Sequence, residues 1–174
     1  MKEEQTRVIE ALRVALQMEL DGKQFYLTAS REAGDRLGKE LFEWLAGEED
    51  KHRQRFEQIY EALRKNEGWP VVEVKPEAGK GWTSLFRGAI ERGKTGDNSK
   101  ELDAAVKAME MEEKTRKYYE SQSREPLPEV ARKFYSALAE EERGHYLALV
   151  EYREYLIDPA GWFRKAEHHS LDGG

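Results

Sequence analysis

The two halves of the chain repeat each other at a fixed offset of 93 residues. Residues 45–52 read Leu-Ala-Gly-Glu-Glu-Asp-Lys-His, and residues 138–145 read Leu-Ala-Glu-Glu-Glu-Arg-Gly-His. Further repeated pairs are Ala15 and Ala108, Glu19 and Glu112, Tyr26 and Tyr119, and Ser30 and Ser123. A repeat without a gap, over segments of helical periodicity, predicts two helical hairpins related by a pseudo-twofold axis and argues against a solenoid of short units.

Each half contains two long segments in which apolar residues recur at steps of three and four. Gly34 lies at the break in the first half, and a Pro-Leu-Pro sequence lies at the break in the second. The predicted helices cover residues 4–33, 36–66, 100–123 and 129–157, with a crossover at 67–99 and a tail at 158–174. This crossover is far longer than a hairpin turn needs, so it can run the length of the bundle and start the second hairpin from the other end. We therefore expect one all-α domain over residues 1–174, a four-helix bundle of two hairpins.

The composition excludes several classes of protein. The chain has no Cys, which leaves His, Asp and Glu as the side chains able to hold a metal. Its formal net charge is −6, and Lys and Arg are scattered among Glu, so we expect neither nucleic acid nor a membrane surface as partner. The first residues contain no apolar stretch like that of a signal peptide, which predicts a cytoplasmic protein.

Polar residues interrupt the apolar seams of all four predicted helices. The first helix of each hairpin has one Glu in its seam, and the second helix has a Glu-x-x-His pair. These residues are Glu19, Glu49 and His52 in the first half, and Glu112, Glu142 and His145 in the second. Each Glu lies about 15 residues from the turn of its hairpin, roughly 22 Å at 1.5 Å per residue, so all six side chains fall at one level.

Four carboxylates at one level of an apolar interior need compensation. An unpaired buried carboxylate costs several kcal/mol, so the group is tolerated only if it is protonated or neutralised. Two divalent cations would supply the four positive charges. The Glu-x-x-His spacing places a carboxylate and an imidazole on one helix face, where both can bind one metal, while Glu from the other helices bridges or caps. The sequence therefore predicts a centre of two metals.

This pattern resembles the ferritin-like di-iron carboxylate proteins, and among them the rubrerythrin-like branch. The resemblance covers residues 4–66 and 100–158 and implies that the six seam residues are ligands of two iron ions, with manganese or a mixed pair as the alternative. Tyr26 and Tyr119, seven residues after Glu19 and Glu112, are similar to the tyrosine that lies beside the site in rubrerythrins. The alternative role for both tyrosines is core packing.

The resemblance implies a non-haem di-iron oxidoreductase that reduces peroxide or dioxygen. Rubrerythrins usually add a rubredoxin-like domain with four Cys, so a chain without Cys is expected to use an external electron donor such as a rubredoxin. We also expect a homodimer. The alternatives are an iron-handling protein, which oxidises or stores Fe(II), and a structural bundle that metal stabilises without turnover.

One position departs from the rubrerythrin pattern. Rubrerythrins place an extra Glu three residues after the ligand of the third helix, where this chain has Thr115 and, at the repeat-equivalent position, Gly22. Thr115 is too short and neutral to replace that carboxylate. We therefore expect a static centre of six ligands, in which His52 and His145 stay bound in both oxidation states.

Two further motifs are given no role in the predicted chemistry. Glu48 and Glu141 precede each His by four residues, and we expect them to face solvent, with orientation of the imidazole as the alternative. Residues 88–95 match the phosphate-binding pattern Gly-x-x-x-x-Gly-Lys-Thr, which requires a strand before it and a helix after it. Because a short helix over 82–92 and a turn are expected there, this segment is interpreted as part of the crossover.

Overall fold

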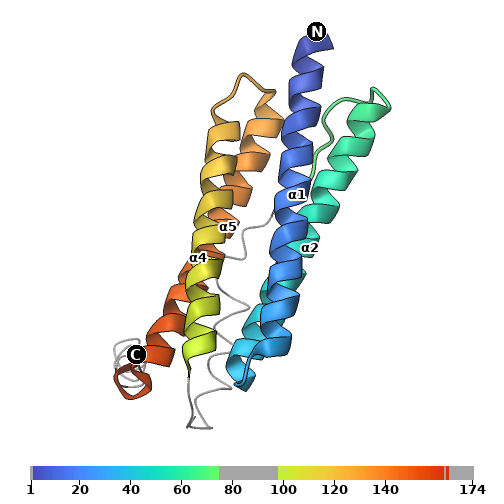
Figure 1. Ribbon diagram of the computed structural model, residues 1–174. Helices are drawn as coiled ribbons and strands as arrows, with labels where there is room; N and C mark the ends of the chain where they lie inside the picture. The colour runs from blue at the N-terminus through green and yellow to red at the C-terminus, as the bar shows by residue number, and fades with distance from the viewer. Residues whose placement is uncertain (1, 75–97, 163, 165–174) are drawn as a thin grey trace.

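Four long α-helices form the protein in the computed structural model, which describes residues 2–74, 98–162 and 164. The helices are α1 (Lys2–Glu32), α2 (Arg36–Arg64), α4 (Ser99–Ser123) and α5 (Glu129–Ile157). Within the described ranges no residue is in a strand. α1 and α2 form one antiparallel hairpin, α4 and α5 form another, and the two lie side by side (Figure 1). The predicted all-α four-helix bundle is confirmed.

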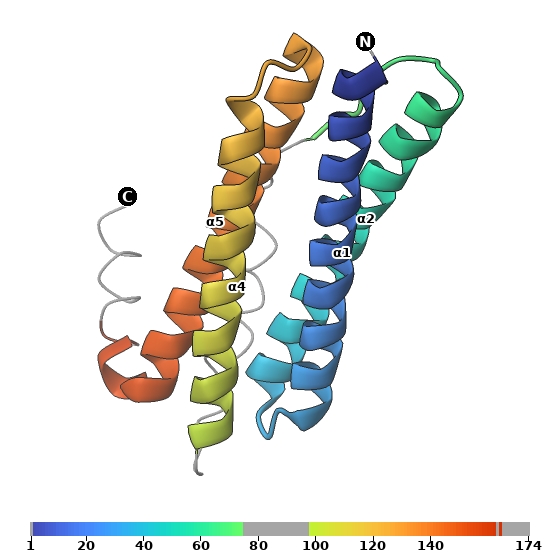
Figure 2. The ribbon, with the colours of Figure 1, turned by 45° about the horizontal axis from the view of Figure 1, so that its top comes forward.

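The two hairpins turn at opposite ends of the bundle. Figure 1 shows the α1–α2 turn at the bottom and the α4–α5 turn at the top, and the view in Figure 2 agrees. α2 therefore ends near the start of α1, whereas α4 begins at the other end, so residues 65–98 connect opposite ends of the bundle. The expected helix at 82–92 and the phosphate-loop pattern at 88–95 lie outside the described residues.

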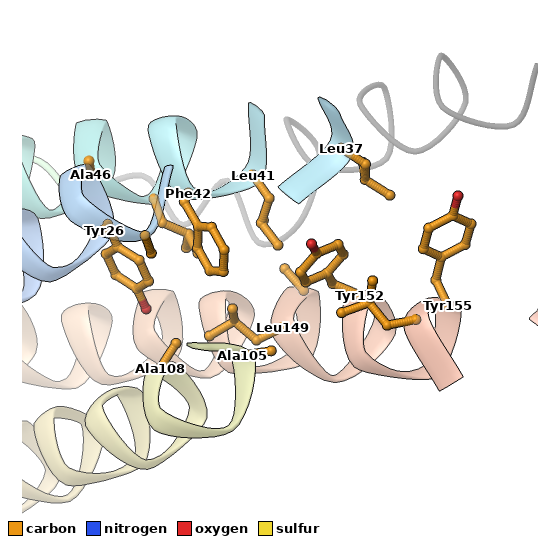
Figure 3. Close-up of a cluster of buried hydrophobic side chains, with 14 of the residues drawn as sticks. Tyr26, Leu37, Leu41, Phe42, Ala46, Ala105, Ala108, Leu149, Tyr152 and Tyr155 are labelled. Carbon is orange, nitrogen blue, oxygen red and sulfur yellow. The ribbon is translucent and has the colours of Figure 1, made fainter. Parts of the chain in front are cut away.

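Two apolar clusters fill the interior, one on each side of a polar layer. In α1, Leu12 and Ala15 precede Glu19 and belong to one cluster, while Tyr26 and Ala29 follow it and belong to the other. Repeat-equivalent residues lie in opposite clusters: Tyr26 and Tyr119, Leu45 and Leu138, Phe42 and Tyr135, and Leu149 and Phe56. Figure 3 shows the cluster around Phe42 between α2 and the pair α4–α5. The pseudo-twofold axis therefore passes through the polar layer.

A close approach at the start of α2 ties the first hairpin to α5. The Asp35 side chain caps α2 by accepting a hydrogen bond from the Gly38 amide at 2.8 Å, and it accepts a second from the Tyr152 hydroxyl at 2.7 Å. A Cβ atom on Gly38 would lie 2.1 Å from the Tyr152 hydroxyl oxygen, so only glycine fits there. This contact holds the end of α5 against the α1–α2 turn.

Candidate metal centre

All six predicted ligands meet in the polar layer between the two apolar clusters. They form two groups in which the candidate ligand atoms lie within 4.8 Å of one another. One group is Glu19, Glu49, His52 and Glu142, and the other is Glu49, Glu112, Glu142 and His145. Each of the six residues is at most 4% exposed. Because Glu49 and Glu142 belong to both groups, two metal ions could share them.

The two imidazoles turn the same ring nitrogen toward the carboxylates. His52 Nδ1 lies 3.1 Å from Glu142 Oε1 and 3.4 Å from Glu19 Oε2. His145 Nδ1 lies 3.2 Å from Glu142 Oε2, with Glu49 Oε1 at 3.5 Å and Glu112 Oε2 at 3.6 Å. The rings themselves stack at a centroid distance of 5.6 Å. The two Nδ1 atoms are therefore the imidazole donors that each group could offer to a metal.

The polar atoms of this layer fit a pair of cations. Among the described side chains, four buried atoms of the layer have no hydrogen-bond partner: Glu19 Oε2, Glu49 Oε1, His52 Nδ1 and Glu142 Oε1. An unsatisfied polar atom in the interior costs about 1–3 kcal/mol, so four of them together need an explanation. Each group brings its donor atoms within 4.8 Å of one another, as the ligands of one ion would lie. Carboxylate and imidazole donors suit iron, manganese or zinc.

Without a cation, the environment of the layer favours the protonated form of several of its side chains. Burial and the neighbouring carboxylates of Glu19 and Glu142 raise the pKa of Glu49 well above its usual value, and burial with Glu142 raises the pKa of Glu112 in the same way. Burial alone would lower the pKa of His52 and His145, but the surrounding carboxylates raise both well above the ordinary imidazole value. Metal binding therefore has to displace protons from the layer.

Two tyrosines hold the carboxylates of the first helix in each hairpin. Tyr26 on α1 donates a hydrogen bond to Glu112 on α4, and Tyr119 on α4 donates one to Glu19 on α1. In Figure 3 the Tyr26 hydroxyl points from α1 toward α4. Burial, together with the adjacent carboxylate, raises the pKa of both phenols well above 10, so both keep their protons as donors. The bonds cross between the hairpins, which the sequence alone did not reveal.

Glu141 does not face solvent, and that expectation is wrong. Its side chain is buried, and its Oε2 lies 2.6 Å from His52 Nε2 and 2.9 Å from Arg55 Nη1. Burial raises the pKa of Glu141, but the bonds from His52 and Arg55 outweigh it and leave the pKa below its usual value. The spacing within α5 suggested an interaction with His145; the carboxylate instead reaches across to the imidazole of α2.

Gly22 also contributes to the layer, by leaving space. A Cβ atom at this position would lie 3.1 Å from Glu49 Oε2, tighter than ordinary van der Waals contact. The missing side chain therefore lets the shared carboxylate lie against α1. Thr115, its repeat equivalent on α4, is partly exposed.

The family comparison matches this geometry. The rubrerythrin family model matches residues 10–152, which include all six residues of the layer. The chain belongs to the rubrerythrin family. The part that matches the rubrerythrin model is a ferritin-like di-iron domain, and the resemblance inferred from the repeat is thereby confirmed. No curated protein and no solved structure gave a match. In the described part of this rubrerythrin-family chain, no helix is both long and apolar enough to cross a membrane.

Proposed function

We propose that the protein is a non-haem di-iron oxidoreductase of rubrerythrin type, which reduces peroxide or dioxygen with electrons from an external donor. The observation that carries the proposal is the pair of overlapping four-residue groups that share Glu49 and Glu142. Two cations bridged by carboxylates supply, when they are iron, a two-electron redox centre. Membership of the rubrerythrin family supports iron as the metal.

The chain's own residues have distinct parts in this proposal. Glu49 and Glu142 belong to both groups and would be shared by two ions, whereas Glu19 and Glu112 each belong to one group and would hold one ion. Tyr26 and Tyr119 keep the carboxylates of this second pair in one rotamer, because each phenol donates to one carboxylate oxygen and leaves the other free. His52 and His145, when neutral, would each give one imidazole nitrogen to one of the two groups.

The reduction of one peroxide to two waters consumes two electrons and two protons. An external one-electron donor, such as a rubredoxin, has to supply the electrons in two transfers, and solvent supplies the protons. We further propose that the protein works as a homodimer. The location that fits such a donor is the cytoplasm.

Anaerobic loading with Fe(II) followed by stopped-flow mixing with peroxide or dioxygen tests the function. We expect two Fe(II) per chain to be oxidised by one peroxide, and further turnover only while a rubredoxin and its reductase are present. Steady consumption of added Fe(II), with a mineral product and no need for a reductant, would instead identify an iron-handling protein. A metal-loaded protein that reacts with neither oxidant would identify a structural bundle.

A Thr115→Glu variant tests the choice of oxidant. If the extra carboxylate of other rubrerythrins favours peroxide through ligand exchange, its absence here should bring the dioxygen rate closer to the peroxide rate. Thr115→Glu should then raise the ratio of the peroxide rate to the dioxygen rate, whereas the neutral control Thr115→Gln should not. An unchanged ratio in Thr115→Glu would show that this position does not set selectivity.

A further inference from the structure

The His52 imidazole is held from outside the metal layer by an ion pair that spans the two hairpins. Glu141 on α5 approaches His52 Nε2 at 2.6 Å, and Arg55 on α2 approaches the same carboxylate oxygen at 2.9 Å. A neutral imidazole has one N–H and one lone pair, so donation from Nε2 to Glu141 fixes the tautomer whose Nδ1 lone pair faces the layer. Glu141 is 8% exposed, which keeps this hydrogen bond away from competing water.

The other imidazole has different surroundings, although its helix repeats the same motif. The repeat equivalent of Glu141 is Glu48, whose carboxylate pairs with Lys51 Nζ at 2.7 Å on the outside of α2. The Trp44 ring packs edge to face against the His145 ring, at a centroid distance of 5.6 Å. Aromatic packing restrains the ring, but it does not supply a carboxylate that would make the imidazole more basic.

Two sequence differences explain why one carboxylate turns inward and the other outward. Arg55, which holds Glu141 in place, is replaced at the equivalent position of α5 by the buried Ala148. Lys51, which pairs with Glu48, is replaced by Gly144. Glu141 therefore pairs with a cation on α2, across the bundle, whereas Glu48 pairs with one on the exposed side of its own helix.

We propose that Glu141 is a positioning residue that makes the His52 position the tighter of the two metal sites. A carboxylate that accepts the outer N–H of a ligand imidazole raises its basicity and fixes its orientation, and loss of such a partner typically lowers metal affinity by about 10- to 100-fold. The inference rests on the metal centre of the proposed function and adds that its two positions are unequal.

Titration of the metal-free, full-length protein with Co(II), followed by visible absorption, tests this inequality. The wild type should fill in two steps. Glu141→Ala should weaken the tighter step by about 10- to 100-fold, and Glu141→Gln, whose amide oxygen still accepts the N–H, should recover much of the loss. The repeat-equivalent control Glu48→Ala should leave both steps unchanged. Circular dichroism melts of the metal-free variants show whether any of them is merely unfolded.

A second readout reports on the hydrogen bond itself. Co(II) shifts the exchangeable ring N–H signals of its imidazole ligands far from the other proton resonances. The His52 Nε2–H signal should exchange slowly with solvent in the wild type and in Glu48→Ala, and rapidly in Glu141→Ala. This difference would not arise if Glu141 contributed only to the packing of α5.

Three results would overturn the inference: equal filling of both sites in the wild type, an unchanged titration in Glu141→Ala, or equal losses in Glu141→Ala and Glu48→Ala. None of these measurements involves peroxide, dioxygen or a reductant. An unchanged Co(II) titration in Glu141→Ala would therefore not contradict the proposed reaction. Conversely, a protein that binds two Co(II) unequally but never turns over peroxide or dioxygen would overturn the reaction alone. A wild type that binds no Co(II) would overturn both.

Discussion

The α1–α2 and α4–α5 hairpins supply the same three candidate ligands each, but they surround those residues differently. Within the layer, the repeat is kept residue by residue, and the two tyrosines mirror each other across the pseudo-twofold axis. Next to the layer, the repeat is not kept: the equivalent of Arg55 is Ala148, and the equivalent of Lys51 is Gly144. The difference shows that the six candidate ligands and the two tyrosines keep the repeat, while some neighbouring charged positions do not and make the two halves unequal.

Removal of the metals should have the largest effect, since each four-residue group draws ligands from both hairpins. Backbone contacts are much denser within each hairpin than between them, so two bound ions would link the halves. Saturation at about 1,000 times Kd contributes about 4 kcal/mol per ion. For a chain of this size, the melting temperature should fall by about 15–30 °C on chelation. Calorimetry of loaded and chelated protein checks this, and equal melting temperatures would contradict the centre.

Loss of a shared carboxylate should have the next largest effect, and the same effect in either half. Glu49→Ala and Glu142→Ala each remove a ligand from both groups, so metal content should drop below about one ion per chain. Glu19→Ala and Glu112→Ala each affect one group and should retain about one ion. Elemental analysis after dialysis distinguishes the two classes.

The same variants should behave differently when metal is absent. Removing one of four buried carboxylates relieves repulsion and desolvation, so metal-free Glu49→Ala should be at least as stable as metal-free wild type. A less stable metal-free variant would mean that Glu49 has a structural role independent of cations.

The tyrosine bonds should contribute equally in the two halves. Tyr26→Phe and Tyr119→Phe each remove a hydrogen bond to a carboxylate, and each should lower the free energy of unfolding of the loaded protein by about 1.5–3 kcal/mol. Tyr135→Phe is the matched control, because the buried Tyr135 hydroxyl has no hydrogen-bond partner among the described residues and its loss should be nearly neutral. Urea unfolding measures the change in the free energy of unfolding for each variant. A large difference between Tyr26→Phe and Tyr119→Phe would show that the two hairpins are unequal inside the layer as well.

The smallest effect is expected at Gly22. A glycine in an exposed helix costs about 0.5–1 kcal/mol relative to alanine, so Gly47→Ala, which meets no atom within 4 Å, should stabilise the protein by that amount. Gly22→Ala gains the same helix propensity, but its methyl group presses on the Glu49 carboxylate. It should therefore stabilise the protein less than Gly47→Ala and weaken metal binding a few-fold in the Co(II) titration. Equal effects of the two variants would mean that Glu49 moves aside without cost.

Helical periodicity was sufficient to predict the bundle and to bring six residues to one level. A polar residue in an apolar seam of period 3.6 has to point inward, and the fixed rise per residue determines its depth. The 93-residue offset then predicted that Glu112, Glu142 and His145 lie in the same layer, without any further assumption. These inferences work because they depend on positions along single helices.

Interactions between helices could not be predicted in the same way. The direction of Glu141 depends on Arg55, which lies 86 residues earlier and on another helix. The tyrosine bonds cross between α1 and α4, and the space that Gly22 leaves is filled from α2. Each of these contacts depends on how one helix is oriented about its axis relative to its neighbour. A spacing pattern within one helix does not contain that information. For Glu141, the available signal was a basic residue on another helix that could pair with a Glu next to the seam. Many Glu and Arg pairs on the surface fit that description equally well.

The division of ligands between the hairpins has a consequence for the order of events during folding. Glu19, Glu49 and His52 come from the first hairpin and lack Glu142, which is the only member of their group that the second hairpin supplies. Each hairpin can form early because its contacts are local along the chain, whereas the docking of one on the other closes a loop of more than thirty residues. A chain that has made only its first hairpin would present three of these donors without the cover of α4 and α5. We therefore expect the full four-donor group, and with it the tightest metal binding, only after the two hairpins have docked.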